Sequence, residues 1–249
     1  MSEKDVVLYF SPHQDDELLT MGVDISKTCL LENKDVHVIL CTDGSKSPAR
    51  QRLNSGDLCP KHNQIHQYNL SVEDFVKARD FEFVSSCKAL GVPSENIHIY
   101  EKRAVDGELS VEYAQEIIRH FVSIYGRNAE ICTITPFRLF QFQHEDHYNL
   151  GLAAKILAKK KEILKTKFFL ESNRLGRFSK RIINNIIYDI KKEEITEEIK
   201  DKIKKAIEVY YYFNPAEKRY AIGSHCVPFL FEFYKKNMLT YCLKPRIRI

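Results

Sequence analysis

Short apolar runs alternate with longer segments of helical period along most of this chain. The apolar runs are Val6–Phe10, Val36–Thr42, Ile97–Tyr100, Ile131–Thr135 and Phe168–Leu170. The first run is apolar at every position, which is typical of a strand buried on both faces. Helical patterns lie between the runs, at Glu17–Glu32, Glu73–Leu90, Val111–Tyr125 and His147–Lys161. We therefore predict an α/β fold, with a Rossmann-like, mostly parallel sheet and helices on both faces.

The remaining segments have weaker patterns. The stretch 51–70 is polar, contains Gly56 and Pro60, and reads as a loop. The stretch 179–212 is charged and helical, and the apolar tail segments Phe229–Tyr234 and Tyr241–Leu243 predict extra strands or a short helix that covers a sheet edge. The sequence shows neither a linker nor an internal repeat. We therefore expect one domain over residues 1–249, with a core at about 5–172 and an extension at about 173–249.

Composition excludes several classes of function. The chain has 249 residues and a formal net charge of only +4. Its lysine-rich stretches, 159–167 and 191–205, mix lysine with glutamate and isoleucine at helical spacing, which favours solvated helix faces over a nucleic-acid surface. Seven cysteines without a C-x-x-C pair, no signal-peptide pattern and no long apolar run predict a cytoplasmic protein with reduced thiols and no membrane span. A homo-oligomer stays possible.

Two short polar segments follow predicted strands at the positions where α/β sheets bind ligands. Ser-Pro-His-Gln-Asp-Asp-Glu, residues 11–17, directly follows the first strand. His-Glu-Asp-His, residues 144–147, lies shortly after the fourth. Because the carboxyl ends of parallel strands meet at one edge of the sheet, we predict that both segments line an active site there.

The spacing within these segments is typical of metal ligands. Residues three apart in a turn come close together, so His13 and Asp16 can bind one ion while Asp15 points to a neighbouring position. One of His144 and His147 can complete the shell while the other faces a substrate. A hydrolytic metal ion takes three protein ligands and an open site for water, and His13, Asp16 and His147 would form such a set, with Asp15 beside the water as a base.

Each segment also has a purely structural interpretation. Asp15 or Asp16 could cap the helix that follows, and Glu17 could serve only as a favourable charge at its N-terminus. His144 and His147 could be ordinary surface residues at the start of a helix. Because both segments fall at the ends of predicted strands, the functional interpretation is the stronger one.

These segments carry a resemblance to a known family. Residues 11–17 resemble the Pro/Ala-His-Pro-Asp-Asp-Glu signature of the PIG-L/LmbE zinc-dependent deacetylases, and residues 144–147 resemble their His-x-Asp-His signature. Three further segments resemble family segments: Asp43–Gly44, Arg79–Glu82 with Ala89–Gly91, and Ala221–His225. The match is good over residues 5 to 155 and loose beyond them.

The resemblance implies a Rossmann-like fold and a zinc-dependent hydrolase that removes N-acyl groups from glucosamine-type sugars, with Fe²⁺ or Co²⁺ as possible substitutes for Zn²⁺. Carried over by motif, the metal ligands are His13, Asp16 and His147, and Asp15 is the general base. His144 is the electrophilic or acid partner, which Asp146 orients. The implied partner is a small N-acyl amino sugar.

This sequence departs from the family pattern at three positions. The prolines inside the two signatures are Gln14 and Glu145, neither of which is a ligand position. Phe142 stands where some members have a tyrosine that helps the developing oxyanion. One transition-state donor is therefore in question, but the mechanism as a whole is not.

The candidate substrate contacts are less strongly indicated. Arg79 and Asp106 could recognise hydroxyl or phosphate groups, although Arg79 could pair with Glu82 and Asp106 could be a turn residue before Gly107. Asp43 could hold a loop or face the substrate. His225 could reach the site from the tail or be structural.

Three other functions fit the same residues. One is hydrolysis of an amide on a non-sugar amine. Another is oxidation by an Fe(II) oxygenase, because such enzymes also bind their iron with two histidines and one carboxylate. Asp15 would have no role in that reaction. The last is a sugar-binding relative without catalytic activity, against which the retention of the ligands and Asp15 argues.

Overall fold

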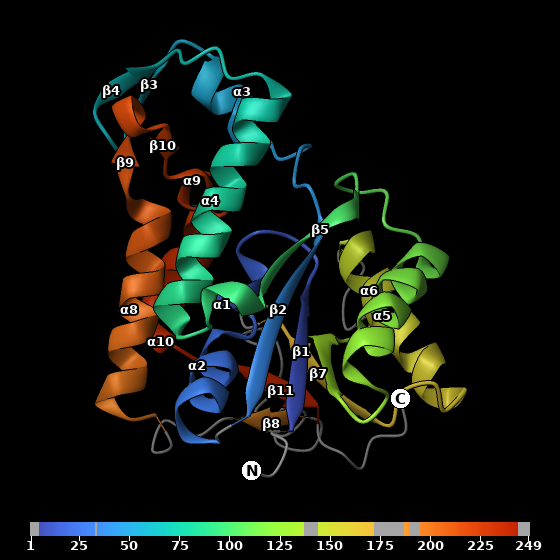
Figure 1. The fold of residues 1–249 in the computed structure, drawn as a ribbon. Helices are drawn as coiled ribbons and strands as arrows, with labels where there is room; N and C mark the ends of the chain where they lie inside the picture. Colours follow the sequence, from blue (N-terminus) through green and yellow to red (C-terminus); the bar gives the residue numbers. More distant parts are fainter. Residues whose placement is uncertain (1–4, 33, 137–143, 172–186, 190–194, 244–249) are drawn as a thin grey trace.

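The structure is a computed structural model, and it describes residues 5–32, 34–136, 144–171, 187–189 and 195–243. Its centre is a seven-stranded sheet of order β5-β2-β1-β6-β7-β11-β8 (Figure 1). The strands are β1 (Val6–Ser11), β2 (Asp35–Thr42), β5 (Ile97–Ala104), β6 (Glu130–Ile134), β7 (Lys165–Leu170), β8 (Ile187–Asp189) and β11 (Tyr241–Leu243). The pairs among β5, β2, β1, β6 and β7 are parallel, and β11 is antiparallel to both β7 and β8. The predicted α/β fold with a mostly parallel sheet is confirmed.

Helices cover both faces of this sheet (Figure 1). The longer ones are α2 (Gly22–Leu31), α4 (Val72–Leu90), α5 (Val111–Tyr125), α6 (Glu145–Lys159), α8 (Glu197–Tyr211) and α10 (Pro228–Asn237). The side chains of β1 show how both helix layers pack on the sheet, because successive side chains of a strand point to opposite faces. Val7 and Tyr9 join the core with α2, α4, α8 and α10, whereas Leu8 and Phe10 join the core with α5 and α6. A strand apolar at every position is thus buried on both sides.

The order of the strands places a topological switch point beside β1. The chain proceeds from β1 to β2 and β5 on one side, then returns to form β6 and β7 on the other. Ligands of open α/β sheets bind outside the carboxyl ends of the strands at such a point. The two polar segments follow β1 and β6, the two strands that flank the switch.

Short elements complete the fold and correct several expectations. They are α1 (Asp16–Leu19), α3 (Ala49–Asn54), β3 (Asp57–Cys59), β4 (Gln64–His66), η1 (Ser94–Asn96), β9 (Phe213–Asn214), η4 (Pro215–Glu217), β10 (Arg219–Tyr220) and α9 (Ile222–Cys226). The expected loop 51–70 holds most of α3 and the β3–β4 hairpin, whose pairing comes from backbone hydrogen bonds that side-chain periodicity does not reveal. The single helix expected over 17–32 is broken at Thr20–Met21 into α1 and α2.

The C-terminal part is mixed rather than uniformly helical. Within the helical pattern expected over 179–212, the structure describes the strand β8 and the helix α8; most of the rest lies outside the described residues. In the tail, the first apolar segment is the helix α10 and the second is the strand β11. The strand β11 pairs with β7 and so covers the edge that β7 would otherwise expose. Within the described part of the chain, no helix combines the length and apolar character needed to span a membrane.

A glycine lets α6 approach the end of β6. A Cβ at Gly151 would lie 2.3 Å from the carbonyl oxygen of Ile134 and 2.7 Å from the nitrogen of Pro136. Those atoms are backbone at the carboxyl end of a central strand and cannot rotate away. The contact fixes the height of α6 above the sheet, and therefore the position of the histidines at its start.

We predict that Gly151→Ala lowers the free energy of unfolding by about 1–3 kcal/mol, the usual cost of overpacking. This loss would occur although alanine is about 1 kcal/mol better than glycine in a helix interior. Urea unfolding measures the change, with Lys159→Ala on the exposed end of the same helix as control. An increase in stability would show that α6 does not pack this closely.

Candidate active site

The loop after β1 has an unusual backbone conformation. Asp15 has a φ of 115° and a ψ of −26°, outside the regions that side chains other than glycine favour. Its backbone N–H donates to the carboxylate of Glu17 at 2.9 Å, and the Tyr210 hydroxyl donates to the other carboxylate oxygen at 2.6 Å. Glu17 is fully buried. Its role is therefore to hold the turn, and the turn directs Asp15 and Asp16 to different positions.

Three potential ligand atoms meet at the switch point. Nδ1 of His13 lies 3.0 Å from Nε2 of His147 and 3.3 Å from Oδ2 of Asp16. Nε2 of His147 lies 3.0 Å from the same oxygen. Ligand atoms about 2.0–2.1 Å from a tetrahedral zinc ion would lie about 3.3 Å apart, so the observed spacing fits one small divalent ion. All three residues are buried and form a group that could hold a metal ion.

Carboxylates orient the outer nitrogen of each histidine. Nε2 of His13 lies 3.0 Å from Oδ2 of Asp146, and this carboxylate also accepts the backbone N–H groups of Gly107 and Leu109. Nδ1 of His147 lies 2.5 Å from Oε1 of Glu171. A carboxylate that accepts the outer N–H of an imidazole fixes the tautomer that presents the inner nitrogen to a metal.

Buried negative charge surrounds these ligands. Asp15, Asp16, Asp106 and Asp146 are all buried, and the buried guanidinium of Arg79 supplies an opposing charge. Burial and the charge of Asp16 raise the pKa of Asp15. Burial acts in the same direction on Asp16, but the charges and hydrogen bonds of the two imidazoles lower its pKa. Since buried carboxylates need a compensating charge, the site favours a cation.

The two histidines of the second segment have different surroundings. His147 is buried, whereas the side chain of His144 is 44% exposed and lies at the mouth of the site. Nδ1 of His144 accepts the backbone N–H of Asp146 at 3.3 Å, and its Nε2 lies 3.9 Å from Oδ1 of Asp106. Burial and the neighbouring imidazoles lower the pKa of His144. If Nδ1 accepts this hydrogen bond, a neutral ring carries its proton on Nε2, on the side that faces Asp106.

The side chain of Asp146 is closer to His13 than to His144. Its Oδ2 lies 3.0 Å from Nε2 of His13 but 3.8 Å from Nδ1 of His144. It contacts His144 more closely through its backbone N–H than through its carboxylate. The orientation of His144 by Asp146 therefore stays a prediction.

Arg79 connects the first two loops. Its two terminal nitrogens donate to the carbonyl oxygens of Gly44 at 2.8 Å and Gln14 at 2.9 Å, and one lies 3.8 Å from the carboxylate of Asp15. Gly44 has a φ of +65°, and a Cβ there would lie 2.5 Å from the guanidinium. The glycine of the Asp43–Gly44 turn is therefore needed for this approach. The buried Arg79 therefore holds the loop after β1 against the Asp43–Gly44 turn.

A cavity of about 460 Å³ opens beside these groups. Its walls include His13, Asp15, Asp16, Arg79, Asp106, His144, His147, Glu171, Lys46, Ser47, Cys226 and Leu230. A volume of this size is in the range of small-molecule sites. In the cavity wall, the carboxylate of Asp106 accepts the backbone N–H of Lys46 at 3.2 Å. Burial acts to raise the pKa of Asp106, but the neighbouring His13 lowers it to about 2.

Not every predicted site residue reaches the cavity. Asp43 accepts the backbone N–H groups of Ser45 and Asp106, so it holds a loop. His225 points to a separate cluster, and the next residue, Cys226, lines the cavity. Phe142 lies outside the described residues. Sequence reasoning missed Glu171, although its place directly after β7 was a usable signal, since polar residues at carboxyl ends of strands line such sites.

Residues 8–158 match the family model described as PIG-L, GlcNAc-PI de-N-acetylase. The chain belongs to this family. No curated protein matches it in sequence. In this PIG-L family chain, the matched region runs from within β1 to within α6 and contains both signature segments and the three candidate ligands.

Solved structures share the fold of this PIG-L family member. The pseudoaglycone deacetylase Dbv21 is similar with a TM-score of 0.64 at 15% identity, over 97% of each chain. The N,N'-diacetylchitobiose deacetylase of Pyrococcus horikoshii gives 0.57 at 18% identity, over 98% of this chain and 85% of the other. A 4-carboxy-2-hydroxymuconate hydratase from Pseudomonas putida gives 0.50 at 11% identity, over 98% of each chain. The fold alone is therefore compatible with more than one reaction.

We predict that His147→Ala lowers bound zinc by about one equivalent per chain, because it removes one of three ligands. His144→Ala should keep the metal, since His144 is grouped with Asp106 and Asp146 and is not one of the three proposed ligands. Equilibrium dialysis followed by elemental analysis measures both, with exposed His120→Ala as control. Metal loss from His144→Ala, with retention in His147→Ala, would exchange the two assignments.

Proposed function

We propose that this chain is a zinc-dependent hydrolase that removes an N-acetyl or similar N-acyl group from an amino-sugar-type small molecule. Membership of the PIG-L deacetylase family supports the reaction class. The observation that carries the proposal is the convergence of His13, Asp16 and His147 beside Asp15, in a cavity with His144 at its mouth. Amide hydrolysis needs a water nucleophile, a base and an oxyanion donor, and these residues can provide each of them.

The donor chemistry of the site fits zinc. Two imidazoles and one carboxylate are the ligand set of many hydrolytic zinc sites, in which one position stays open. When bound, such an ion lowers the pKa of water and polarises a carbonyl oxygen. His13 and His147 hold their inner nitrogens toward the ion because Asp146 and Glu171 accept their outer N–H groups. Fe²⁺ and Co²⁺ can occupy the same ligands.

Asp15 is the general base of this proposal. Its neighbour Asp16 faces the histidines, and the strained turn directs Asp15 into the cavity and toward Arg79. A buried carboxylate with a raised pKa takes a proton from water more readily than an ordinary one. Arg79 and Glu17 act as positioning residues, since one holds the loop carbonyls and the other holds the N–H of Asp15.

His144 stabilises the oxyanion of the tetrahedral intermediate. Its Nδ1 accepts a backbone N–H, so a neutral ring carries its proton on Nε2, which faces Asp106 and the cavity. That N–H donates to the developing oxyanion, and Asp15 returns its proton to the leaving amine. Removing a comparable oxyanion donor typically costs about 10²- to 10³-fold in rate.

The cavity walls suit a sugar. Asp106 and Lys46 offer an acceptor and a donor for hydroxyl groups, and Leu19, Val227 and Leu230 form an apolar side. A pyranose presents hydroxyl edges and an apolar face, so it complements both. We propose Asp106 as the hydroxyl contact nearest the reaction centre, since its Oδ1 is 3.3 Å from Nε2 of His13.

We predict that Asp15→Asn lowers turnover by about 10²- to 10⁴-fold, the usual cost of losing a general base. Asparagine tolerates a positive φ, so the turn should persist and zinc content should be unchanged. Steady-state kinetics and elemental analysis on the same samples provide the test, with exposed Asp201→Asn as control. Loss of zinc from Asp15→Asn, with activity restored by excess zinc, would make Asp15 a ligand instead of the base.

The substrate class is tested by amine release. A panel of N-acetylglucosamine conjugates and non-sugar N-acyl amines should yield free amine only from the sugars. A chelator should abolish release, and added Zn²⁺ or Co²⁺ should restore it. Release from the non-sugar amines alone would favour a different amide hydrolase. Sugar binding without release in the zinc-loaded protein would favour a non-catalytic relative.

A further inference from the structure

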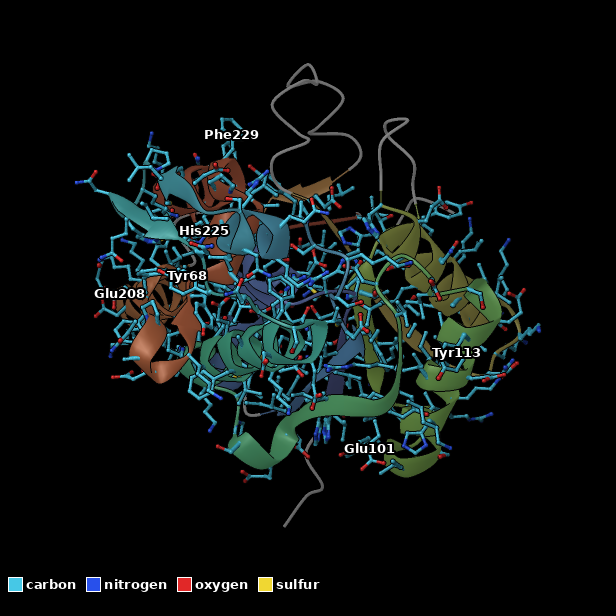
Figure 2. The ribbon with its side chains drawn as sticks, turned by 90° about the horizontal axis from the view of Figure 1, so that it is seen from above. Tyr68, Glu101, Tyr113, Glu208, His225 and Phe229 are labelled. Atoms are coloured by element: carbon cyan, nitrogen blue, oxygen red, sulfur yellow. The ribbon has the colours of Figure 1, made fainter. Side chains whose placement is uncertain are left out.

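A second group of metal-ligating side chains lies at the end of the molecule that carries the β3–β4 hairpin (Figure 1). The hairpin contributes Cys59, His62 and His66, in the spacing Cys-x₂-His-x₃-His, and α9 contributes His225. One ligand atom of each lies within 4.8 Å of the others. Figure 2, seen from above, labels His225 close to this hairpin.

We propose that Cys59, His62, His66 and His225 form a structural zinc site, separate from the candidate active site and independent of the proposed function. Sγ of Cys59 lies 3.5 Å from Nε2 of His225 and 4.0 Å from Nδ1 of His62, which lies 3.3 Å from Nε2 of His66. Tetrahedral zinc with S at about 2.3 Å and N at about 2.0–2.1 Å spaces its ligands about 3.3–3.6 Å apart.

The type and number of donors identify the ion and its role. Thiolate and imidazole ligands suit zinc and exclude magnesium and calcium, which take oxygen ligands. Four protein ligands close a tetrahedral shell, which is typical of structural sites, whereas a catalytic site keeps one position open. The proposed ligands of the candidate active site are two imidazoles and one carboxylate, without a thiolate, so the two sites differ in chemistry.

The surroundings orient these ligands. Nδ1 of His225 donates to the carbonyl oxygen of Ala221 at 2.8 Å, so its Nε2 presents a lone pair to the cluster. The ring of Phe213 stacks on His62 and His66, with centroids 3.9 and 5.1 Å apart. His66 and His225 are buried, while Cys59 and His62 are partly exposed and provide a path of entry.

The hairpin is short, and its own apolar side chains bury little surface. Each strand has three residues, and two of its apolar side chains, Leu58 and Ile65, are 61% and 63% exposed. An isolated two-stranded hairpin is marginally stable in water. A metal ion that joins the hairpin to α9 would add to its stability, because a site absent from the unfolded chain adds its binding energy to folding.

The proposed site also braces the active-site cavity. The guanidinium of Arg52 donates to the carbonyl oxygen of His225 at 2.7 Å, and Glu82 accepts the backbone N–H groups at the start of α9. Cys226 follows His225 directly and forms part of the cavity wall, where the Ser47 hydroxyl contacts its sulfur. Zinc at the hairpin would therefore fix the position of this wall.

Cobalt titration of the metal-free full-length protein tests the proposal. A Co²⁺ ion bound to Cys59 should give thiolate-to-metal charge-transfer absorption, which the His13–Asp16–His147 group cannot produce. Cys59→Ser should abolish this band, and Cys226→Ser, the matched control, should keep it. His147→Ala should also keep the band while losing the other bound ion, which separates this site from the proposed function.

Trypsin cleavage after the exposed Lys61 gives a second measurement. Zinc should slow this cleavage in the wild type and in Cys226→Ser, but not in Cys59→Ser or His66→Ala. The proposal is overturned if Co²⁺ gives no thiolate band in the wild type, or if the band survives in Cys59→Ser. Either result would make the cluster a packing arrangement of side chains around Phe213.

Discussion

The imidazole of His13 is the element on which the candidate site depends, because it contacts both sides of the switch point. Its Nδ1 faces Asp16 and His147, and its Nε2 faces Asp146. Asp146 in turn accepts two N–H groups from the loop after β5. One ring therefore joins the loop after β1, the start of α6 and the loop after β5. Only parallel strands on the two sides of β1 bring those three segments to one edge.

Packing far from the cavity maintains the strained turn at Asp15. A residue in such a conformation costs about 1–3 kcal/mol and persists only where its surroundings determine it. Here the determinants are the fully buried Glu17 and its hydrogen bond from Tyr210 of α8. Tyr210 also packs in the core that α8 shares with α2 and α4. The C-terminal region, although outside the matched family segment, thus supports the loop after β1.

The short helix α9 connects the two clusters of potential metal ligands. His225 faces the hairpin, and Cys226 faces the cavity. Glu82 of α4 holds the N-terminus of α9, and burial raises its pKa to about 7 although those hydrogen bonds act to lower it. A change at the hairpin would reach the cavity wall through these few contacts. The two clusters therefore share one structural support while differing in ligand chemistry.

The sequence determined the parts of this protein that rest on local pattern. Apolar runs and helical periods gave the parallel sheet, and the spacing within 11–17 and 144–147 indicated which residues could share an ion. The contact of Glu171 with His147 and the position of His225 were decided by the tertiary structure. Glu171 meets His147 across 24 positions, and His225 meets Cys59 across 166. Contacts at such separations come from how the layers pack, and periodicity within a short window carries no information about them.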